Sequence, residues 1–133
     1  MKLSTRSRYG TRFMIDLARN SSNSPVQLGE IAKRQNISVK YLEQLIAPLK
    51  KANLIKSLRG PKGGHMLARA PEEITFGEIV DALESGIALT RCAADPKVCK
   101  RSRNCETRKI WGIATQAVSD RLNSIRLSEV DSL

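Results

Sequence analysis

Apolar residues recur at intervals of three and four between residues 24 and 66, which is the spacing of one face of an α-helix. The first stripe consists of the apolar residues Leu28, Ile31 and Ala32 and continues to the polar Gln35, and the second consists of Leu42, Leu45, Ile46 and Leu49. Between them, Asn36-Ile37-Ser38 breaks the periodicity. The pattern therefore predicts two helices that meet across a tight turn.

Ser38 is expected to cap the second helix, because its hydroxyl can accept a hydrogen bond from a free N–H of the first turn. Ile37 and Leu42 flank this cap at the positions of a hydrophobic staple, which fixes where a helix begins. The opposite face carries residues that can hydrogen-bond to bases, namely Lys40, Tyr41, Glu43 and Gln44. A helix lying in the major groove of DNA needs such residues near its N-terminus.

Two short apolar runs, residues 54–58 and 66–68, are expected to form strands joined by a basic, glycine-rich loop. With the helix pair, this hairpin predicts a winged helix-turn-helix in which Arg59 enters the minor groove. The loop glycines permit unusual backbone angles and close approach. An ordinary helical hairpin followed by a surface turn fits the same spacing, so the pattern alone leaves both interpretations open.

Three further stretches are expected to be helical. Residues 4–19 are expected to pack on the helix pair while the arginines of this helix, Arg8 among them, contact backbone phosphates. Thr75 and Glu78 form a capping box for a core helix.

The last stripe consists of Ile110, Trp111, Ala114, Ala117, Val118, Leu122 and Ile125. A stripe of roughly 30 Å is too long for the compact core, so it predicts pairing with the same helix of a second copy in a two-fold homodimer.

The expected fold is mainly α with a small β-wing. A winged helix-turn-helix region at residues 1–86 is followed, within one structural domain, by a three-cysteine loop and a long dimerisation helix at residues 87–133. No apolar run reaches membrane-spanning length, and the first residues lack the apolar block of a signal peptide. We therefore expect a cytoplasmic protein without a membrane partner.

Positive charge is concentrated in one half of the chain, whose net charge is +10. Residues 1–66 hold 13 basic and three acidic side chains, whereas residues 67–133 hold ten of each sign. The basic half is the half with the winged-helix pattern, and a positive face attracts phosphates. This segregation favours double-stranded DNA as the partner.

Other functions have less support in the sequence. The chain has too few aromatic residues for an RNA-stacking platform, and no catalytic pair or nucleotide-binding motif indicates an enzyme.

The three cysteines of the chain lie where the apolar stripe is interrupted. They are Cys92, Cys99 and Cys105, with six residues between the first two and five between the last two. Three is an odd number, which argues against a closed disulfide framework. Seven basic residues between positions 91 and 109 would lower the pKa of the thiols and offset the negative charge of a cluster. An iron–sulfur cluster, zinc held by three sulfurs and bare redox-sensing thiols all fit this loop.

Several motifs together resemble the IscR and NsrR family of bacterial winged-helix regulators. They are Met1-Lys2-Leu3-Ser4-Thr5, Arg8-Tyr9-Gly10, Ile37-Ser38, Tyr41-Leu42-Glu43-Gln44-Leu45, Arg59-Gly60-Pro61-Lys62-Gly63-Gly64, Ile74 with Gly77-Glu78-Ile79, and three cysteines ahead of Trp111. The resemblance covers nearly the whole chain. It implies a homodimeric transcription factor that binds a pseudo-palindromic operator and carries an iron–sulfur cluster in its cysteine loop.

The resemblance also implies roles for individual residues. Those facing the major groove are Ser38, Lys40, Tyr41, Glu43 and Gln44, and those facing the minor groove are Arg59, Gly60, Pro61, Lys62 and Gly63. Cys92, Cys99 and Cys105 match the cluster ligands. Arg108 stands where the family pattern has a histidine, so the fourth ligand is open. A four-iron cube tolerates a non-cysteine position more easily than a two-iron cluster, which favours 4Fe-4S over 2Fe-2S.

The sequence therefore predicts a DNA-binding transcriptional regulator, interpreted as a repressor, whose operator affinity depends on the cluster. Such a protein would sense iron, redox or nitric oxide status. The alternative is a cluster-free regulator of the same fold that responds to thiol oxidation or to a partner protein, for example in cysteine metabolism.

Overall fold

The computed structural model describes residues 2–21 and 23–133, and Met1 and Ser22 lie outside this part of the chain. The helices are α1 (Thr5–Asn20), α2 (Leu28–Gln35), α3 (Val39–Lys51), α4 (Phe76–Glu84), α5 (Arg91–Ala94) and α6 (Glu106–Asn123). The strands are β1 (Ile55–Leu58) and β2 (Gly64–Leu67), and short 3-10 turns are η1 (Pro71–Glu73), η2 (Pro96–Val98), η3 (Ser102–Asn104) and η4 (Leu127–Ser132). The predicted fold, mainly α with a small β-wing, is confirmed.

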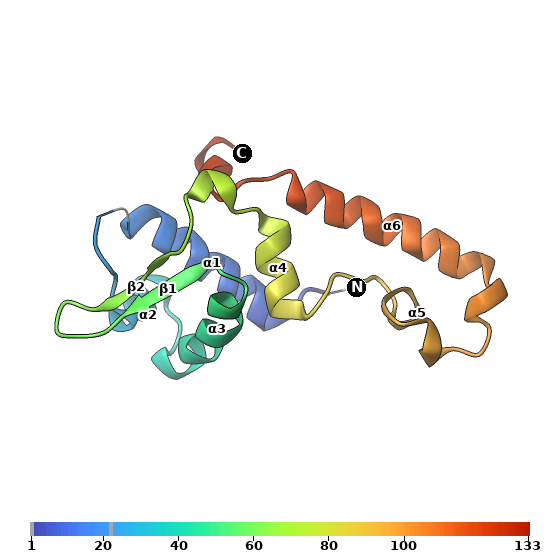
Figure 1. Cartoon of the computed structure of the whole chain (residues 1–133), viewed down its shortest axis with the longest axis horizontal. Helices are drawn as coiled ribbons and strands as arrows, with labels where there is room; N and C mark the ends of the chain where they lie inside the picture. The colour runs from blue at the N-terminus through green and yellow to red at the C-terminus, as the bar shows by residue number, and fades with distance from the viewer. Residues whose placement is uncertain (1, 22) are drawn as a thin grey trace.

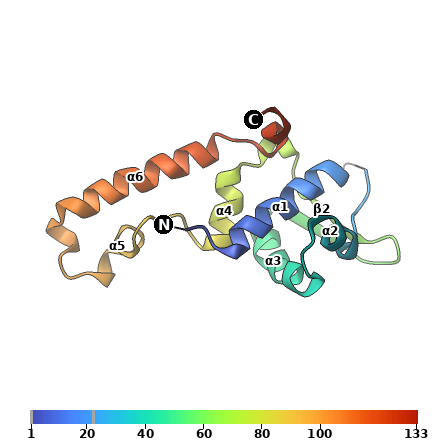
Figure 2. The ribbon, with the colours of Figure 1, turned by 180° about the vertical axis from the view of Figure 1, so that it is seen from behind.

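The molecule is elongated, with a compact body at one end and an arm at the other (Figure 1). The body consists of α1 to α4 with the β1–β2 hairpin, and the arm consists of α5 and α6. The wing and the cysteine-bearing turns lie at opposite ends, as the view from behind also shows (Figure 2). Among the described residues, no helix is both long and apolar enough to cross a membrane.

The core of the body is built from the apolar stripes that the sequence shows. Its fully buried members include Phe13, Met14, Leu17, Ile31, Leu42, Leu45, Leu49, Ile79 and Leu83. α1 and α4 approach so closely that a Cβ at Gly10 would lie 2.1 Å from Cδ1 of Leu83. A larger residue at this crossing would therefore have to displace the Leu83 side chain.

The hairpin differs slightly from the sequence expectation, because β2 begins at Gly64, two residues earlier. Antiparallel pairing places Leu58 opposite Gly64. On its other side, His65 exchanges two backbone hydrogen bonds of 2.8 Å with Val26. These bonds extend the strand, so the wing loop comprises residues 59–63 only.

The C-terminal end of the predicted dimerisation stripe returns to the body. Leu127 is 3% exposed and donates its N–H to the Ile74 carbonyl at 2.8 Å, and Phe76 N donates to the Ile125 carbonyl at 3.0 Å. Leu122 and Ile125 pack, partly buried, against the same core. The stripe is therefore divided: its last residues pack on their own chain, and its first residues stay exposed on the arm.

Candidate nucleic-acid interface and cysteine loop

The start of α3 is fixed by Ser38, as the sequence predicts. Its Oγ accepts a hydrogen bond from the backbone N–H of Tyr41 at 3.1 Å. Ile37 and Leu42, at the staple positions, are 7% and 0% exposed. Because both sides of this turn are anchored in the core, the first turn of α3 has a fixed direction at the surface.

The predicted base-reading face of α3 consists mainly of exposed polar side chains, namely Ser38, Lys40, Glu43 and Gln44. Tyr41 is only partly exposed, because its ring meets the ring of Tyr9 edge-on at a centroid distance of 5.5 Å. Val39, which the sequence analysis did not select, is 41% exposed at the first position of the helix. The signal that could have identified Val39 as a candidate base-reading residue is an apolar residue directly after the capping serine. Such a residue can make apolar contact with the methyl group of thymine.

The arginines of α1 have different roles. Arg8 is exposed, and its guanidinium donates to Oγ1 of Thr5 at 3.3 Å, within the same helix. Arg12 lies over the ring of Tyr9 at 5.5 Å and donates to the backbone carbonyl and the side chain of Gln35. Arg8 is thus presented to solvent, whereas Arg12 fastens α1 to α2.

The wing loop presents charged side chains on a turn shaped by glycines. Its exposed residues are Arg59, Gly60, Pro61 and Lys62. Gly60 has a φ of +108°, which favours glycine. Gly63 is buried, its N–H donates to the Gly60 carbonyl at 2.9 Å, and a Cβ there would lie 2.2 Å from the Leu58 carbonyl oxygen. Gly63 therefore closes the turn that carries Arg59 and Lys62.

His65, the only histidine of the chain, is a strand residue. Its Nδ1 lies 2.8 Å from Oγ of Ser57 on the paired strand. Burial lowers the pKa of His65, and the charge of Lys50 lowers it further. His65 is therefore neutral at pH 7 and belongs to the packing of the hairpin.

A buried carboxylate anchors the helix-turn-helix to α1. Asp16 is 3% exposed, which is unusual for a charged side chain. Arg34 donates to both of its oxygens, at 2.6 and 3.0 Å, and Gln35 donates at 2.9 Å. Burial by itself would raise the pKa of Asp16, but the hydrogen bonds from Arg34, Gln35 and Asn20 and the charge of Arg34 hold it below its ordinary value.

The cysteine loop, residues 91–105, is ordered by side chains that bond to the backbone. Oxygens of Thr90 and Asp95 cap α5 and η2. Ser102 is 5% exposed and donates to the Cys99 carbonyl at 2.6 Å. Such local bonds leave no trace in hydrophobic periodicity, so the sequence pattern alone could not predict these turns.

The structure brings two of the three free thiols to one surface. Cys92 and Cys99 line the same hollow of about 320 Å³, whereas Cys105 lines another hollow of about 690 Å³ beside Arg101 and Arg103. In the part of the chain that the structure describes, no three Cys, His, Asp or Glu side chains are gathered so that they could hold a metal ion.

The loop is tied directly to the start of α6. Cys105 is the N-cap residue of α6, and its Sγ lies 3.1 Å from Oγ1 of Thr107. Hydrogen bonds from the Thr107 hydroxyl and the Arg108 backbone lower the pKa of the Cys105 thiol. The Arg108 side chain, at the position where the resemblance implies a histidine, donates to the Cys92 carbonyl at 2.8 Å.

The donor chemistry of the loop fits an iron–sulfur cluster. Three free thiols among basic residues can bind iron as thiolates. Cys105 would have to approach Cys92 and Cys99 for all three to bind one cluster.

Comparison with known proteins agrees with this architecture. The Rrf2 family of iron-dependent transcriptional regulators matches residues 3–131. The Rrf2 protein of Nitratidesulfovibrio vulgaris is 47% identical over 130 residues, which are 98% of this chain and 87% of that protein.

Two solved structures are also similar. CymR, the global cysteine regulator of B. subtilis, is 37% identical with a TM-score of 0.80, over 99% of this chain and 97% of that one. IscR of T. potens is 38% identical with a TM-score of 0.79, over 99% of this chain and 87% of that one. Relatives of this kind are transcriptional regulators and not enzymes. The chain therefore belongs to the Rrf2 family of winged-helix transcriptional regulators.

Proposed function

We propose that this regulator binds a pseudo-palindromic operator as a homodimer and represses transcription from it. The observation that carries the proposal is the capped start of α3, with an exposed polar face, beside an exposed basic wing. In a two-fold complex, Ser38, Lys40, Glu43 and Gln44 would reach base edges in the major groove. Arg59 and Lys62 would reach the minor groove, and Arg8 a phosphate.

The exposed part of α6 supports the dimer. Ile110, Trp111 and Ile113 are 56%, 44% and 73% exposed. α6, all of which the structure describes, has no buried residue of its own. An apolar helix face of this kind is removed from water when it packs against the same face of a second copy. Pairing of two arms would place two basic bodies on one duplex.

The cysteine loop is the proposed sensor, because it holds the start of the dimerisation helix. A change at Cys105 acts on the N-cap of α6, and a change at Cys92 acts on the carbonyl that Arg108 binds. Cys92, Cys99 and Cys105 would hold an iron–sulfur cluster, with 4Fe-4S favoured over 2Fe-2S. When bound, such a cluster supplies a group that reacts with nitric oxide or oxygen. The cluster would also be lost when iron is short.

The second candidate is a cluster-free regulator that responds to thiol oxidation or to a partner protein. It is favoured by the separation of Cys105 from the hollow that Cys92 and Cys99 share. The similarity to CymR, which is a cysteine regulator, also favours it.

Visible absorption, with iron and sulfide assays after anaerobic purification, tests the proposal. We expect a coloured protein containing iron and sulfide, and a Cys99→Ala variant that has lost both colour and any response to nitric oxide. Leu133→Ala, at an exposed position outside the cysteine loop, is the matched control and should keep both. A Cys99→Ala protein that kept the absorption and the response would contradict the cluster proposal. A colourless wild type whose DNA binding changes on thiol oxidation would establish the second candidate.

A further inference from the structure

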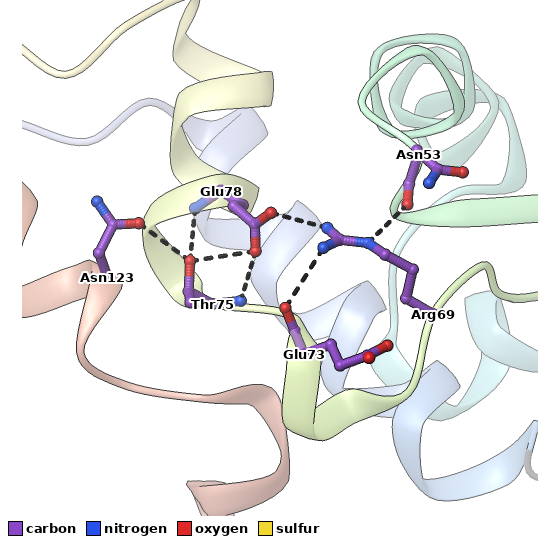
Figure 3. Close-up of polar contacts among 6 residues, drawn as sticks. All are labelled: Asn53, Arg69, Glu73, Thr75, Glu78 and Asn123. Carbon is purple, nitrogen blue, oxygen red and sulfur yellow. Dashed lines mark hydrogen bonds and ion pairs between the residues drawn. The ribbon is translucent and has the colours of Figure 1, made fainter.

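The end of α6 meets the body at a polar junction with the start of α4 (Figure 3). The hydroxyl of Thr75 donates to Oδ1 of Asn123 at 3.0 Å. A Cβ at Gly77 would lie 2.1 Å from the same oxygen, so the end of the Asn123 side chain occupies the space next to Gly77. A movement of α6 therefore changes the hydrogen bond that Thr75 makes with Asn123.

Thr75 is held in turn by Glu78 in the capping box of α4. The Glu78 N–H donates to Oγ1 of Thr75 at 3.1 Å, and the Thr75 N–H donates to Oε2 of Glu78 at 2.9 Å. Burial by itself would raise the pKa of Glu78, but the hydrogen bonds from Thr75 and Arg69 and the charge of Arg69 hold it below its ordinary value. Glu78 is thus a carboxylate at neutral pH.

Arg69 joins this box to the DNA-reading elements. Its Nη2 donates to Oε1 of Glu78 at 2.8 Å, its Nη1 to the Glu73 carbonyl at 3.4 Å, and its Nε to the Asn53 carbonyl at 3.2 Å. Asn53 has a φ of +56° and forms the turn between α3 and β1. One guanidinium therefore links η1, α4 and the point where the recognition helix passes into the wing (Figure 3).

We propose that Arg69 is a positioning residue that sets the orientation of α3 and the wing relative to α6. A planar guanidinium offers several donors in a fixed geometry, so it can hold three acceptors from three elements at once. A displacement at Asn123 passes through Thr75 and Glu78 to Arg69, and from there to Asn53. The inference rests on the proposed function, because only in a dimer does this orientation determine the spacing of two recognition helices.

Backbone amide NMR spectra of the free protein test the coupling without DNA. Asn123→Ala is expected to shift the signals of residues 53–55, although Asn123 does not contact them. In an Arg69→Gln background, Asn123→Ala should leave these signals unmoved. Arg19→Gln, which removes the exposed Arg19–Asp131 ion pair elsewhere on the body, is the matched control and should preserve the coupling. Unchanged signals in the single variant, or equal shifts in both backgrounds, would overturn the proposal.

Arg69→Lys separates charge from geometry. A lysine keeps the positive charge but lacks the planar fork, so the Asn123→Ala shift should again fail to reach residues 53–55. If Arg69→Lys transmits the shift as fully as the wild type, the proposed role of the fork is wrong.

Binding to duplexes enriched from a random pool connects the coupling to function. For Arg69→Gln we expect about tenfold weaker binding to the full inverted repeat and a change of less than twofold on a single half-site, since coupling energies are typically of this order. Equal losses on both duplexes would mean a local structural role and would overturn the proposal. Failure of the wild type to bind duplex DNA would refute the proposed function, and the NMR comparison would still decide the coupling.

Discussion

At the scale of single residues, polar side chains determine how the reading surface is held. Ser38 could be predicted from the sequence, because a cap involves atoms only three residues apart. Asp16 could not, because its partner Arg34 is 18 residues away and no periodicity connects them. The same applies to Arg69, whose acceptors lie on three separate elements.

Asp16→Asn is expected to lower the free energy of unfolding by about 1–3 kcal/mol at pH 7, because Arg34 loses its charged partner. The pKa of Asp16 in the folded protein lies below its ordinary value of 3.8. Its contribution is therefore fully present above that value and is lost as the pH falls through the folded pKa. Urea denaturation at pH 7 and pH 3 should show the difference between wild type and variant shrinking in acid.

Asp131→Asn is the control for this prediction. It breaks the Arg19–Asp131 pair, in which the side chains are 54% and 75% exposed, and should cost less than about 1 kcal/mol. If the two variants behave alike, or if the cost of Asp16→Asn does not depend on pH, the proposed role of the buried carboxylate is wrong.

At the scale of elements, the sequence predicted those helices whose ends and apolar faces depend on residues close together in the chain. The capping box of Thr75 and Glu78 and the helix of Leu28–Gln35 are confirmed. The cysteine loop was harder, because its turns depend on single side-chain-to-backbone bonds such as those of Ser102. The predicted stripe on α6 could not reveal that Leu122 packs on its own chain, since periodicity identifies an apolar face but not the surface that covers it.

The junction of α4 and α6 can be tested with a matched pair of glycine variants. Gly77→Ala should displace the exposed Asn123 side chain and break its hydrogen bond with Thr75, which lowers the free energy of unfolding by about 0.5–1.5 kcal/mol. Gly29→Ala, on an open face of α2 with nothing within 4 Å, should raise it by about 0.5–1 kcal/mol. Chemical denaturation measures both. A stabilising Gly77→Ala would show that the hydrogen bond between Asn123 and Thr75 contributes little to stability.

At the scale of the whole molecule, two ends with different chemistry are joined by one helix. The basic half of the chain forms most of the body, and the segment from α5 to the start of α6, which contains the three cysteines, lies at the far end of the arm (Figure 1). The arm presents its apolar residues to solvent in a single chain. The central claim is that a second chain covers them and that the pair reads DNA.

Ile110→Asp should convert the dimer into a monomer, because it places a charge in the apolar face that a partner would cover. Sedimentation velocity at micromolar concentration measures this change. Leu133→Asp, at a position 79% exposed outside α6, is the control and should remain dimeric. A dimer that tolerates Ile110→Asp must use another face.

The most direct test of the central claim is selection of duplexes from a random pool by the anaerobically purified protein in low salt. We predict enrichment of an inverted repeat whose half-sites lie about one helical turn apart, or roughly 34 Å. Enrichment of a single half-site, or no enrichment at any thiol oxidation state, would contradict the account.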